Sequence, residues 1–583
     1  MNRQTNHSES CRCGCQDEPS RRSFLKSALM TGLGISSGVP AVAGSLQGDA
    51  KHLKSIQKSQ AIRKQKAHQI TLLYTADIHS QLLTHDEFFI ENNKIVYKKR
   101  GGFAVLKTML QTLKSENPEN TLVIDAGDCF QGGGVASLSK GASIVPLINN
   151  IGYDLVLPGN WEVAYGKEMM WKDLGAYHAQ KICANMYHDT TDELKGELIF
   201  QPYWTKIIGG IKIGFIGYND PLTPKRQSPA YSVGIRFAKP EANVAKYIRI
   251  LKDYEKCQMV FLVTHMGLTQ QVDLGNQSYV DGVDFILGAD THERIRKPIQ
   301  AKYAKVVEPG SFGSFVGRLD FVIEKGVVKD YNYELLDVAP EKYKPNKEME
   351  MLVDAAYEPF KAELGKVIGY SKTPLLRYYV LETPIDNLIT DAIMEKFKPD
   401  IALSNGFRFC PPLVPDTKTG LATLTNDFLW SMFPVDSEAK QAQITGKQLW
   451  NWLEKELNNV FAKNPAQRFG GWLVRFQGMK INFTAGNEMG QRLNWVRVGD
   501  SPIDLAKTYT VVACEREGDP DNVICRIEGV SNPKKLGGYL HDAIRDYLGR
   551  HSPISPMLEG RASATDLPNT LLSQLEGYDY QFM

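Results

Sequence analysis

The sequence has almost no net charge, no internal repeat and no low-complexity tract. A formal charge of +2 over 583 residues gives no basis for binding nucleic acid or bulk membrane. Beyond the N-terminal segment, no apolar run is long enough to cross a bilayer, so no stable membrane span is expected in the mature form. With 43% apolar and 23% charged residues, the composition is that of an ordinary soluble globular protein.

CxxC pairs are lacking among the six cysteines that follow the N-terminal segment. These are Cys129, Cys183, Cys257, Cys410, Cys514 and Cys525. An exported protein can form disulfides, and Cys514 and Cys525 are the nearest pair. The sequence leaves the pairing open.

The first 43 residues are predicted to be an export signal. Arg21 and Arg22 precede a mildly apolar run that ends in the cleavage site Ala41-Val42-Ala43. The paired arginines resemble a twin-arginine signal, with an uncleaved anchor or a chance arginine pair as the alternatives. We therefore predict passage through the twin-arginine export machinery and a periplasmic mature protein. The Lys-, Gln- and Ser-rich residues 44–68 are predicted to be a linker.

The chain is too long for one hydrophobic core, so two or more domains are expected. Residues 69–338 alternate strand and helix patterns, which is typical of a layered α/β domain. Residues 339–372 are predicted to be a linker that contains a single amphipathic helix at 348–364. A second domain is predicted at 373–560, with a strand-like run at 474–483, and residues 561–583 are predicted to be a tail.

Polar side chains follow five predicted strands of the first domain, at the point where each strand ends. They are Asp77 and His79 after residues 70–74, Asp128 after 121–125, Asn160 after 155–158, His265 after 259–264, and Asp290 and His292 after 285–287. Ligands collect at the carboxyl ends of parallel strands, and these oxygen and nitrogen donors suit zinc, manganese or iron. Seven donors are too many for one ion, so we predict two ions about 3.5–4 Å apart that share Asp128.

Each donor also has a simpler explanation. Asp128 could form an Asx-turn, Asn160 could cap a helix, and His265 and His292 could be hydrogen-bonded core histidines. Their recurrence at the same place on successive strands favours the metal site.

In series, the motifs Asp-x-His, Gly-Asp, Gly-Asn-x-Glu, Thr-His and Asp-x-His resemble the calcineurin-type metallophosphoesterases of the 5′-nucleotidase family. The resemblance runs from about residue 69 to residue 548. It implies a layered α/β metallophosphoesterase domain followed by an α+β domain of the 5′-nucleotidase type that binds the substrate. It also implies two ligand sets, one made of Asp77, His79, Asp128 and His292, and the other of Asp128, Asn160, His265 and Asp290.

Two residues depart from the nucleotidase pattern. Trp161 stands where nucleotidases have a catalytic histidine, and an indole N–H donates a hydrogen bond but cannot shuttle a proton. Asp290 stands where they usually have a histidine. Its negative charge favours a harder ion, so two Mn²⁺ ions are expected, with zinc and iron as the alternatives.

The Trp-Glu pair after Asn160 resembles the SoxB family of periplasmic thiosulfohydrolases, although SoxB proteins typically have histidine in place of this asparagine. Similar stretches are found at residues 224–237, 402–409, 469–475 and 489–492. The resemblance implies release of sulfate from a thiosulfonate group on a cysteine of a SoxYZ-like sulfur-carrier protein. The alternative is a periplasmic 5′-nucleotidase or broad phosphoesterase that acts on a small phosphate ester. A metal-stabilised binding protein ranks last, because the shared ligand Asp128 is present.

Residues of the second domain are predicted to contact the substrate. Arg408 is predicted to clamp the substrate anion, because a guanidinium presents a planar fork to sulfonate or phosphate oxygens. With it, Asp128 and Asn160 form the predicted catalytic set. The other predicted substrate contacts are Trp161, Phe469, Trp472 and Arg475. A surface salt bridge for Arg408 and core positions for the aromatic residues are the alternatives.

Overall fold

The computed structural model describes residues 69–570 except 93 and 407–409. All of them belong to one compact unit, Ser59–Met583. The predicted signal peptide (1–43), the predicted linker (44–68), the predicted anion clamp Arg408 and the last part of the predicted tail (571–583) lie outside the described residues.

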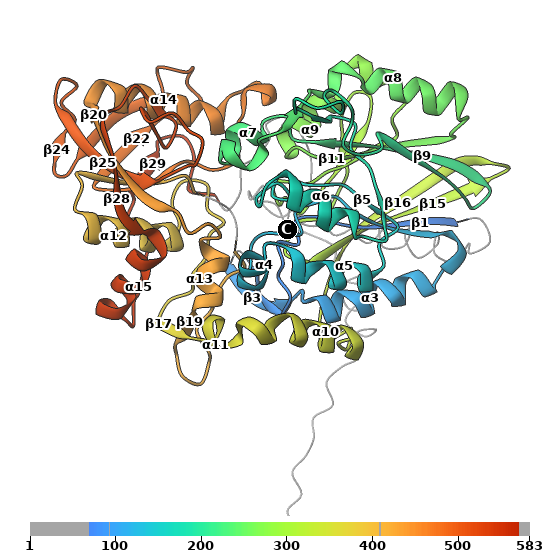
Figure 1. Cartoon of the computed structure of the whole chain (residues 1–583), viewed down its shortest axis with the longest axis horizontal. Coiled ribbons are helices and arrows are strands. Elements are labelled where there is room, and N and C mark those ends of the chain that lie inside the picture. The colour runs from blue at the N-terminus through green and yellow to red at the C-terminus, as the bar shows by residue number, and fades with distance from the viewer. Residues whose placement is uncertain (1–68, 93, 407–409, 571–583) are drawn as a thin grey trace, which may run out of the picture. The chain divides into compact units, whose positions relative to one another are not determined.

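Two six-stranded sheets form the first domain (Figure 1). In spatial order, the first contains β16 (Val327–Asp337), β15 (Phe315–Glu324), β1 (Gln69–Thr75), β4 (Thr121–Asp125), β5 (Leu155–Val156) and β6 (Gln180–Lys181). The second contains β13 (Ile299–Gln300), β14 (Lys305–Val307), β12 (Phe285–Leu287), β11 (Met259–His265), β9 (Ile211–Asn219) and β8 (Tyr203–Ile208). The strands β1, β4, β5 and β6 run parallel, as do β9, β11, β12 and β14.

The two sheets pack face to face, with helices on their outer surfaces. Along β11, Phe261 packs into the shared core, where its ring lies 5.8 Å from that of Phe321 in the other sheet. The alternate residues Val260 and Leu262 face the helical side, as the two-residue period of a strand requires. The helices of this domain are α3 (Phe103–Ser115), α4 (Gly134–Ser139), α5 (Val145–Ile151), α6 (Lys167–Gly175), α7 (Thr223–Arg226), α8 (Val244–Arg249) with a π-helical turn at Ile250–Tyr254, and α9 (Leu268–Gly275). Two short ribbons complete it: β2 (His85–Glu91) with β3 (Lys94–Arg100), and β7 (Met186–His188) with β10 (Ile235–Phe237).

The second domain has a five-stranded and a four-stranded sheet. The five-stranded sheet contains β21 (Arg475–Gln477), β18 (Ile401–Ser404), β25 (Thr508–Cys514), β20 (Glu438–Thr445) and β28 (Ser531–Tyr539). The four-stranded sheet contains β24 (Ser501–Pro502), β23 (Leu493–Val498), β22 (Met479–Phe483) and β29 (Ala562–Ala564). The helices are α12 (Pro384–Phe397), α13 (Asn426–Met432), α14 (Gly446–Phe461) and α15 (Leu540–His551). The pairs β17 (Val367–Ser371) with β19 (Ala422–Thr425), and β26 (Val523–Ile524) with β27 (Ile527–Glu528), lie outside these sheets.

The structure corrects three details of the prediction. The linker helix is divided into α10 (Lys347–Tyr357), a 3₁₀ turn at Glu358–Phe360 and α11 (Lys361–Leu364), because Pro359 cannot donate the next helical hydrogen bond. The strand run 474–483 is divided at Gly478, whose φ of 88° turns the chain from one sheet into the other. The predicted tail is wrong for residues 562–564, because they form β29 and pair with β22.

Candidate metal centre

The ligands predicted at the strand ends gather on tight loops with unusual backbone angles. A left-handed φ occurs at Asp77 (53°), His79 (49°), Asp128 (63°), Asp290 (92°) and His292 (64°). Each such non-glycine residue costs roughly 1–3 kcal/mol and persists where the surrounding structure imposes it. Backbone strain is therefore concentrated in the loops that carry the candidate site.

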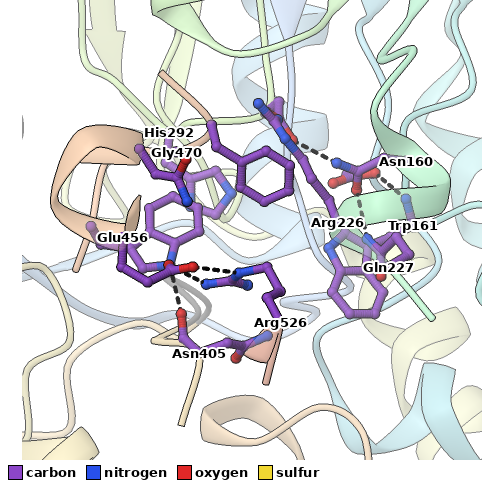
Figure 2. A pocket seen from close by; sticks show the side chains of 14 residues that line it. Asn160, Trp161, Arg226, Gln227, His292, Asn405, Glu456, Gly470 and Arg526 are labelled. Atoms are coloured by element: carbon purple, nitrogen blue, oxygen red, sulfur yellow. Dashed lines mark hydrogen bonds and ion pairs between the residues drawn. The ribbon is translucent and has the colours of Figure 1, made fainter. Parts of the chain in front are cut away.

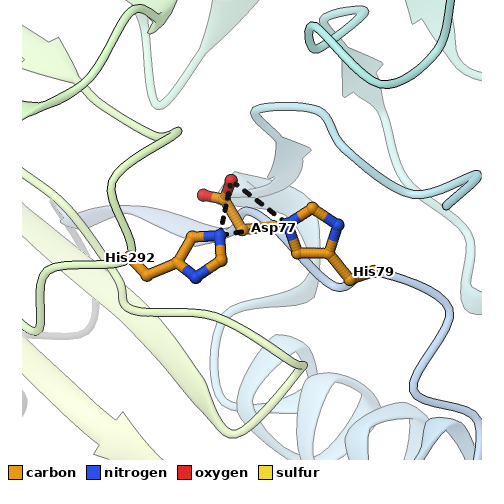
Figure 3. A group of neighbouring side chains, drawn as sticks. All are labelled: Asp77, His79 and His292. Carbon is orange, nitrogen blue, oxygen red and sulfur yellow. Dashed lines mark hydrogen bonds and ion pairs between the residues drawn. The ribbon is translucent and has the colours of Figure 1, made fainter. Parts of the chain in front are cut away.

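One group of possible ligands consists of Asp77, His79 and His292 (Figure 3). The Nε2 atoms of the two histidines are 3.0 Å apart. They lie 3.9 Å and 3.6 Å, respectively, from Oδ1 of Asp77. All three side chains are buried, so their donor atoms converge in a space shielded from water.

A second group consists of Asp77, Asp128 and His265. Nε2 of His265 lies 3.0 Å from Oδ2 of Asp128 and 3.7 Å from Oδ1 of Asp77. Asp77 thus belongs to both groups, whereas the sequence predicted that Asp128 would be shared. Oδ2 of Asp128 is also only 3.8 Å from Nε2 of His79, so both carboxylates lie between the groups.

The hydrogen bonds of two histidines show that this donor set fits a cation. Nδ1 of His79 lies 2.9 Å from the carbonyl oxygen of Gln131, and Nδ1 of His265 lies 2.8 Å from that of Ala126. A carbonyl only accepts, so each Nδ1 carries the proton and each Nε2 directs a lone pair at the site. A backbone carbonyl that fixes the tautomer in this way is usual behind a metal-bound histidine.

The electrostatics of the buried groups agree with cation binding. Burial lowers the pKa of His79 to about 4, so this imidazole is neutral near pH 7, the form that binds metals. Burial alone would also lower the pKa of His265, but the carboxylates of Asp128 and Asp77 outweigh it and raise that pKa. The same two carboxylates would attract a divalent metal ion.

Asn160 and Asp290 lie beside the second group and are hydrogen-bonded to each other. Nδ2 of Asn160 donates to Oδ1 of Asp290 at 2.6 Å, and that oxygen is 3.8 Å from Nε2 of His265. Gln227 donates to Oδ1 of Asn160 at 3.0 Å, and Arg226 forms an ion pair with Oδ2 of Asp290. The sequence predictions gave no role to Arg226 or Gln227 at the end of the four-residue helix α7, although both lie within residues 224–237, one of the stretches that resemble the SoxB family.

Glu162 joins two of the ligand loops, although no role was predicted for it. Its buried carboxylate accepts hydrogen bonds from the backbone N–H groups of Asp128 (2.9 Å), Cys129 (2.6 Å), Phe130 (3.2 Å) and Gly159 (2.6 Å). One side chain thereby joins the loops that follow β4 and β5, two neighbouring strands of the first sheet.

Glu162→Ala should therefore destabilise the fold by about 3 kcal/mol or more, because it leaves buried N–H groups without acceptors at about 1–3 kcal/mol each. Thermal unfolding measured by circular dichroism would test this. Glu168→Ala, at an exposed position on α6, is the control and should change the melting temperature little. An equal effect of the two variants would contradict the proposed role of Glu162 in holding the two loops together.

A pocket opens from the metal site toward residues of the second domain (Figure 2). Phe469 lies between two guanidinium groups, 5.4 Å from Arg226 and 5.6 Å from Arg526. Glu456 binds Arg526 through both carboxylate oxygens, at 3.0 and 2.6 Å. Asp128, Asn160, Trp161, Asp290, His292, Asn405 and Trp472 also line the pocket. Predicted metal ligands and predicted substrate contacts therefore face the same space.

Arg475 does not line this pocket, and its predicted substrate contact is wrong. The side chain is buried, where it binds Asp386 at 3.1 Å and donates to the carbonyl oxygens of Val380 and Tyr379. All three of its donor nitrogens are used within the second domain. The candidate cations in the described part of the pocket are instead Arg226 and Arg526.

The chain matches two family models. Residues 70–294 match the calcineurin-like phosphoesterase model, and residues 367–515 match the C-terminal domain of 5′-nucleotidase. The chain is therefore a metal-dependent hydrolase of the calcineurin-like and 5′-nucleotidase family, and the predicted two-domain α/β architecture is confirmed. This fold implies two divalent metal ions, which the two groups of donors fit.

Similar proteins cover nearly the whole chain. The 5′-nucleotidase of Vibrio vulnificus is 24% identical over 560 residues, which is 85% of this chain and 93% of the relative. The trifunctional nucleotide phosphoesterase YfkN of Bacillus subtilis is 26% identical over 79% of this chain, but this chain spans only 34% of YfkN. Two solved structures from Thermus thermophilus share the fold. The sulfate thiohydrolase SoxB has a TM-score of 0.75 and 20% identity, and the match covers 86% of this chain and 97% of that one. A 5′-nucleotidase precursor has a TM-score of 0.73 and 23% identity, and the match covers 86% of this chain and 100% of that one. In the described ranges, no helix has the length and apolar character that a membrane span needs.

Proposed function

We propose that this protein is an exported, SoxB-like dimetal hydrolase that releases sulfate from a thiosulfonate group on a cysteine of a carrier protein. Trp161 is the observation that supports this substrate best. It is buried, it lines the pocket, and its backbone N–H donates to Oδ1 of Asp128 at 2.8 Å. An indole at this position cannot protonate a leaving group.

In this proposal, Asp77, His79, Asp128 and His292 hold one ion, and Asp128, Asn160, His265 and Asp290 hold the other. The ions supply an activated water and neutralise charge on the oxyanion. Three carboxylates and an amide oxygen in the combined set favour manganese. The paired arginines at 21 and 22 support export by the twin-arginine route to the periplasm.

The leaving group distinguishes the candidate substrates. Water attacks the sulfonate sulfur and forms a new S–O bond, while the bond between this sulfur and the outer sulfur on the cysteine breaks. Sulfate leaves with the protons of the water. The carrier keeps the outer sulfur as a persulfide anion, which needs no proton to depart. A nucleoside alkoxide is a poorer leaving group and benefits from a general acid. Besides Asp128, the acids among the described pocket residues are Asp290 and Glu456. Both carboxylates are held in ion pairs with arginines.

A second cavity adjoins the first pocket and would be the route of the carrier to the site in this proposal. It shares Trp161, Arg226, Gln227 and Asn405 with the first pocket and continues past Tyr231. Two adjoining cavities with common walls suit a narrow peptide arm that carries the modified cysteine.

A 5′-nucleotidase is the second candidate. Phe469 offers an aromatic surface between two guanidinium groups, where a nucleobase and a phosphate could bind together. Asn160 matches the nucleotidase pattern, and the Vibrio vulnificus relative is a 5′-nucleotidase.

The test compares two substrates on the same manganese-loaded protein. We expect sulfate release from a carrier protein with a thiosulfonated cysteine, measured by ion chromatography, at a kcat/KM at least about 100-fold above that for AMP. The same carrier with an alkylated cysteine is the control. Rapid phosphate release from AMP without any sulfate from the carrier would replace the first candidate by the second.

A further inference from the structure

Arg226 lies, partly buried, between two carboxylates at the edge of the metal site. Its NH1 atom is 2.5 Å from Oδ2 of Asp290 and 3.3 Å from Oδ2 of Asp220. Asp220 is fully buried and is held in place by the backbone N–H of Leu222, which donates to Oδ1 at 2.9 Å. The guanidinium therefore has a fixed position that does not depend on a substrate.

The two oxygens of Asp290 have different partners. Oδ2 binds Arg226, whereas Oδ1 accepts from Asn160 at 2.6 Å and lies 3.8 Å from Nε2 of His265. The backbone N–H of Asp290 donates to the carboxylate of Asp77 at 3.1 Å. The residue is thus held at both its backbone and its side chain, with Oδ1 directed toward the second group of donors.

The charges of the site explain why an arginine is needed here. Three carboxylates, those of Asp77 and Asp128 from the first sheet and Asp290 from the second, meet at the site, and a charge removed from water is costly unless it is paired. A cation in the second group is close to Asp77 and Asp128, which leaves the charge of Asp290 to be balanced separately. Arg226 offsets part of that charge at Oδ2 of Asp290, and Asp220 shares the same guanidinium.

We propose that Arg226 is a positioning residue for the second metal ion. It pairs with Asp290 and holds this carboxylate so that Oδ1 would face the ion. Asp290, Arg226 and Asp220 then act as one unit, because the same guanidinium nitrogen contacts both carboxylates. This role of Arg226 is the same for either candidate substrate, because it affects only how tightly and where the metal ion would bind.

A double-mutant cycle on metal affinity tests this unit. The variants are Asp290→Asn, Arg226→Met and the two together, each titrated with Mn²⁺ in a calorimeter. Asp290→Asn takes a carboxylate away from the ion and leaves a guanidinium, paired only with Asp220, beside it, so binding of the second Mn²⁺ should weaken at least about 100-fold. Arg226→Met frees the carboxylate and should weaken it about 10-fold.

The double variant gives the decisive comparison. With the guanidinium removed as well, it should bind the second Mn²⁺ at least about 10-fold more tightly than Asp290→Asn alone. A double variant that is as weak as Asp290→Asn, or weaker, would overturn the proposal, because two independent residues give additive losses. Binding of the first Mn²⁺, which should stay unchanged in all variants, shows that the fold is intact.

Two more variants keep the test informative if Asp290→Asn does not fold. Arg226→Lys retains the charge and should keep the second Mn²⁺ within about 3-fold of the unmodified protein. Arg526→Met removes the other guanidinium of the pocket, which pairs with Glu456 and not with a predicted ligand, and should leave both Mn²⁺ affinities unchanged. Equal losses in Arg226→Lys and Arg226→Met, or a loss of the second ion in Arg526→Met, would contradict the proposed role.

Discussion

Asp128→Asn should abolish hydrolysis of any substrate and release bound metal. Oδ1 of Asp128 accepts the backbone N–H of Trp161, while Oδ2 faces His265 at 3.0 Å. In asparagine the remaining oxygen must face the Trp161 N–H, so the NH₂ group turns toward the donors of the metal site. The variant therefore loses a negative charge and places a hydrogen-bond donor where a cation binds. We expect kcat to fall by more than about 1,000-fold, which exceeds the loss typical of a single electrostatic contact.

Metal content by elemental analysis and steady-state rates would check this result. Asp354→Asn is the matched control, because it makes the same chemical change at an exposed position on α10. It should retain full metal content and full activity. An Asp128→Asn protein with two bound ions and normal turnover would disprove the role of Asp128 as a metal ligand.

The position of the metal ligands could be predicted because it follows from the sheet. Asp77 and Asp128 follow the neighbouring parallel strands β1 and β4 of the first sheet, and His265 ends β11 of the second sheet, so the carboxyl ends of strands from both packed sheets meet at the site. What the sequence could not show is which ligand lies between the ions. That depends on how the loops bend, and the left-handed φ values of Asp77 and Asp128 place both carboxylates there.

The residues around the ligands were harder to predict, because their roles depend on distant partners. Arg226 contacts the site through its ion pair with Asp290, which lies 64 residues later in the chain. Glu162 was recognised as part of a motif, but its four backbone partners become neighbours only when two loops meet. The predicted substrate contact of Arg475 was wrong for the opposite reason. Its local motif suggested an anion contact, whereas the fold turns its guanidinium into a buried ion pair with Asp386.

The substrate pocket also depends on contacts between the two domains. Arg516 donates to the carbonyl oxygens of Lys225 and Gln227, on either side of Arg226. Gln131, whose carbonyl orients His79, donates through its side chain to the carbonyl of Pro434. The second domain therefore holds segments that border the metal site, which explains why neither domain pattern alone indicated the pocket.

Trp161→His should convert the protein into a much better phosphomonoesterase toward AMP. A histidine beside the pocket can protonate the nucleoside oxygen as it departs, and general acid catalysis contributes about 10²–10⁴-fold. We expect kcat for AMP to rise about 100-fold, at the lower end of this range, because the new side chain is smaller than the buried indole and less firmly held. Release of sulfate from the thiosulfonated carrier should not rise, since its persulfide leaves without a proton.

Two comparisons separate proton donation from a simple change in pocket shape. Trp161→Phe keeps an aromatic ring but offers no proton, so its rate with AMP should stay low. With p-nitrophenyl phosphate, whose nitrophenolate departs as a stable anion, Trp161→His should gain less than about 10-fold. A gain that is equal for AMP and p-nitrophenyl phosphate, or that appears in Trp161→Phe, would show that the indole acts by blocking the pocket. The choice between sulfur and phosphate chemistry would then depend on access and not on the leaving group.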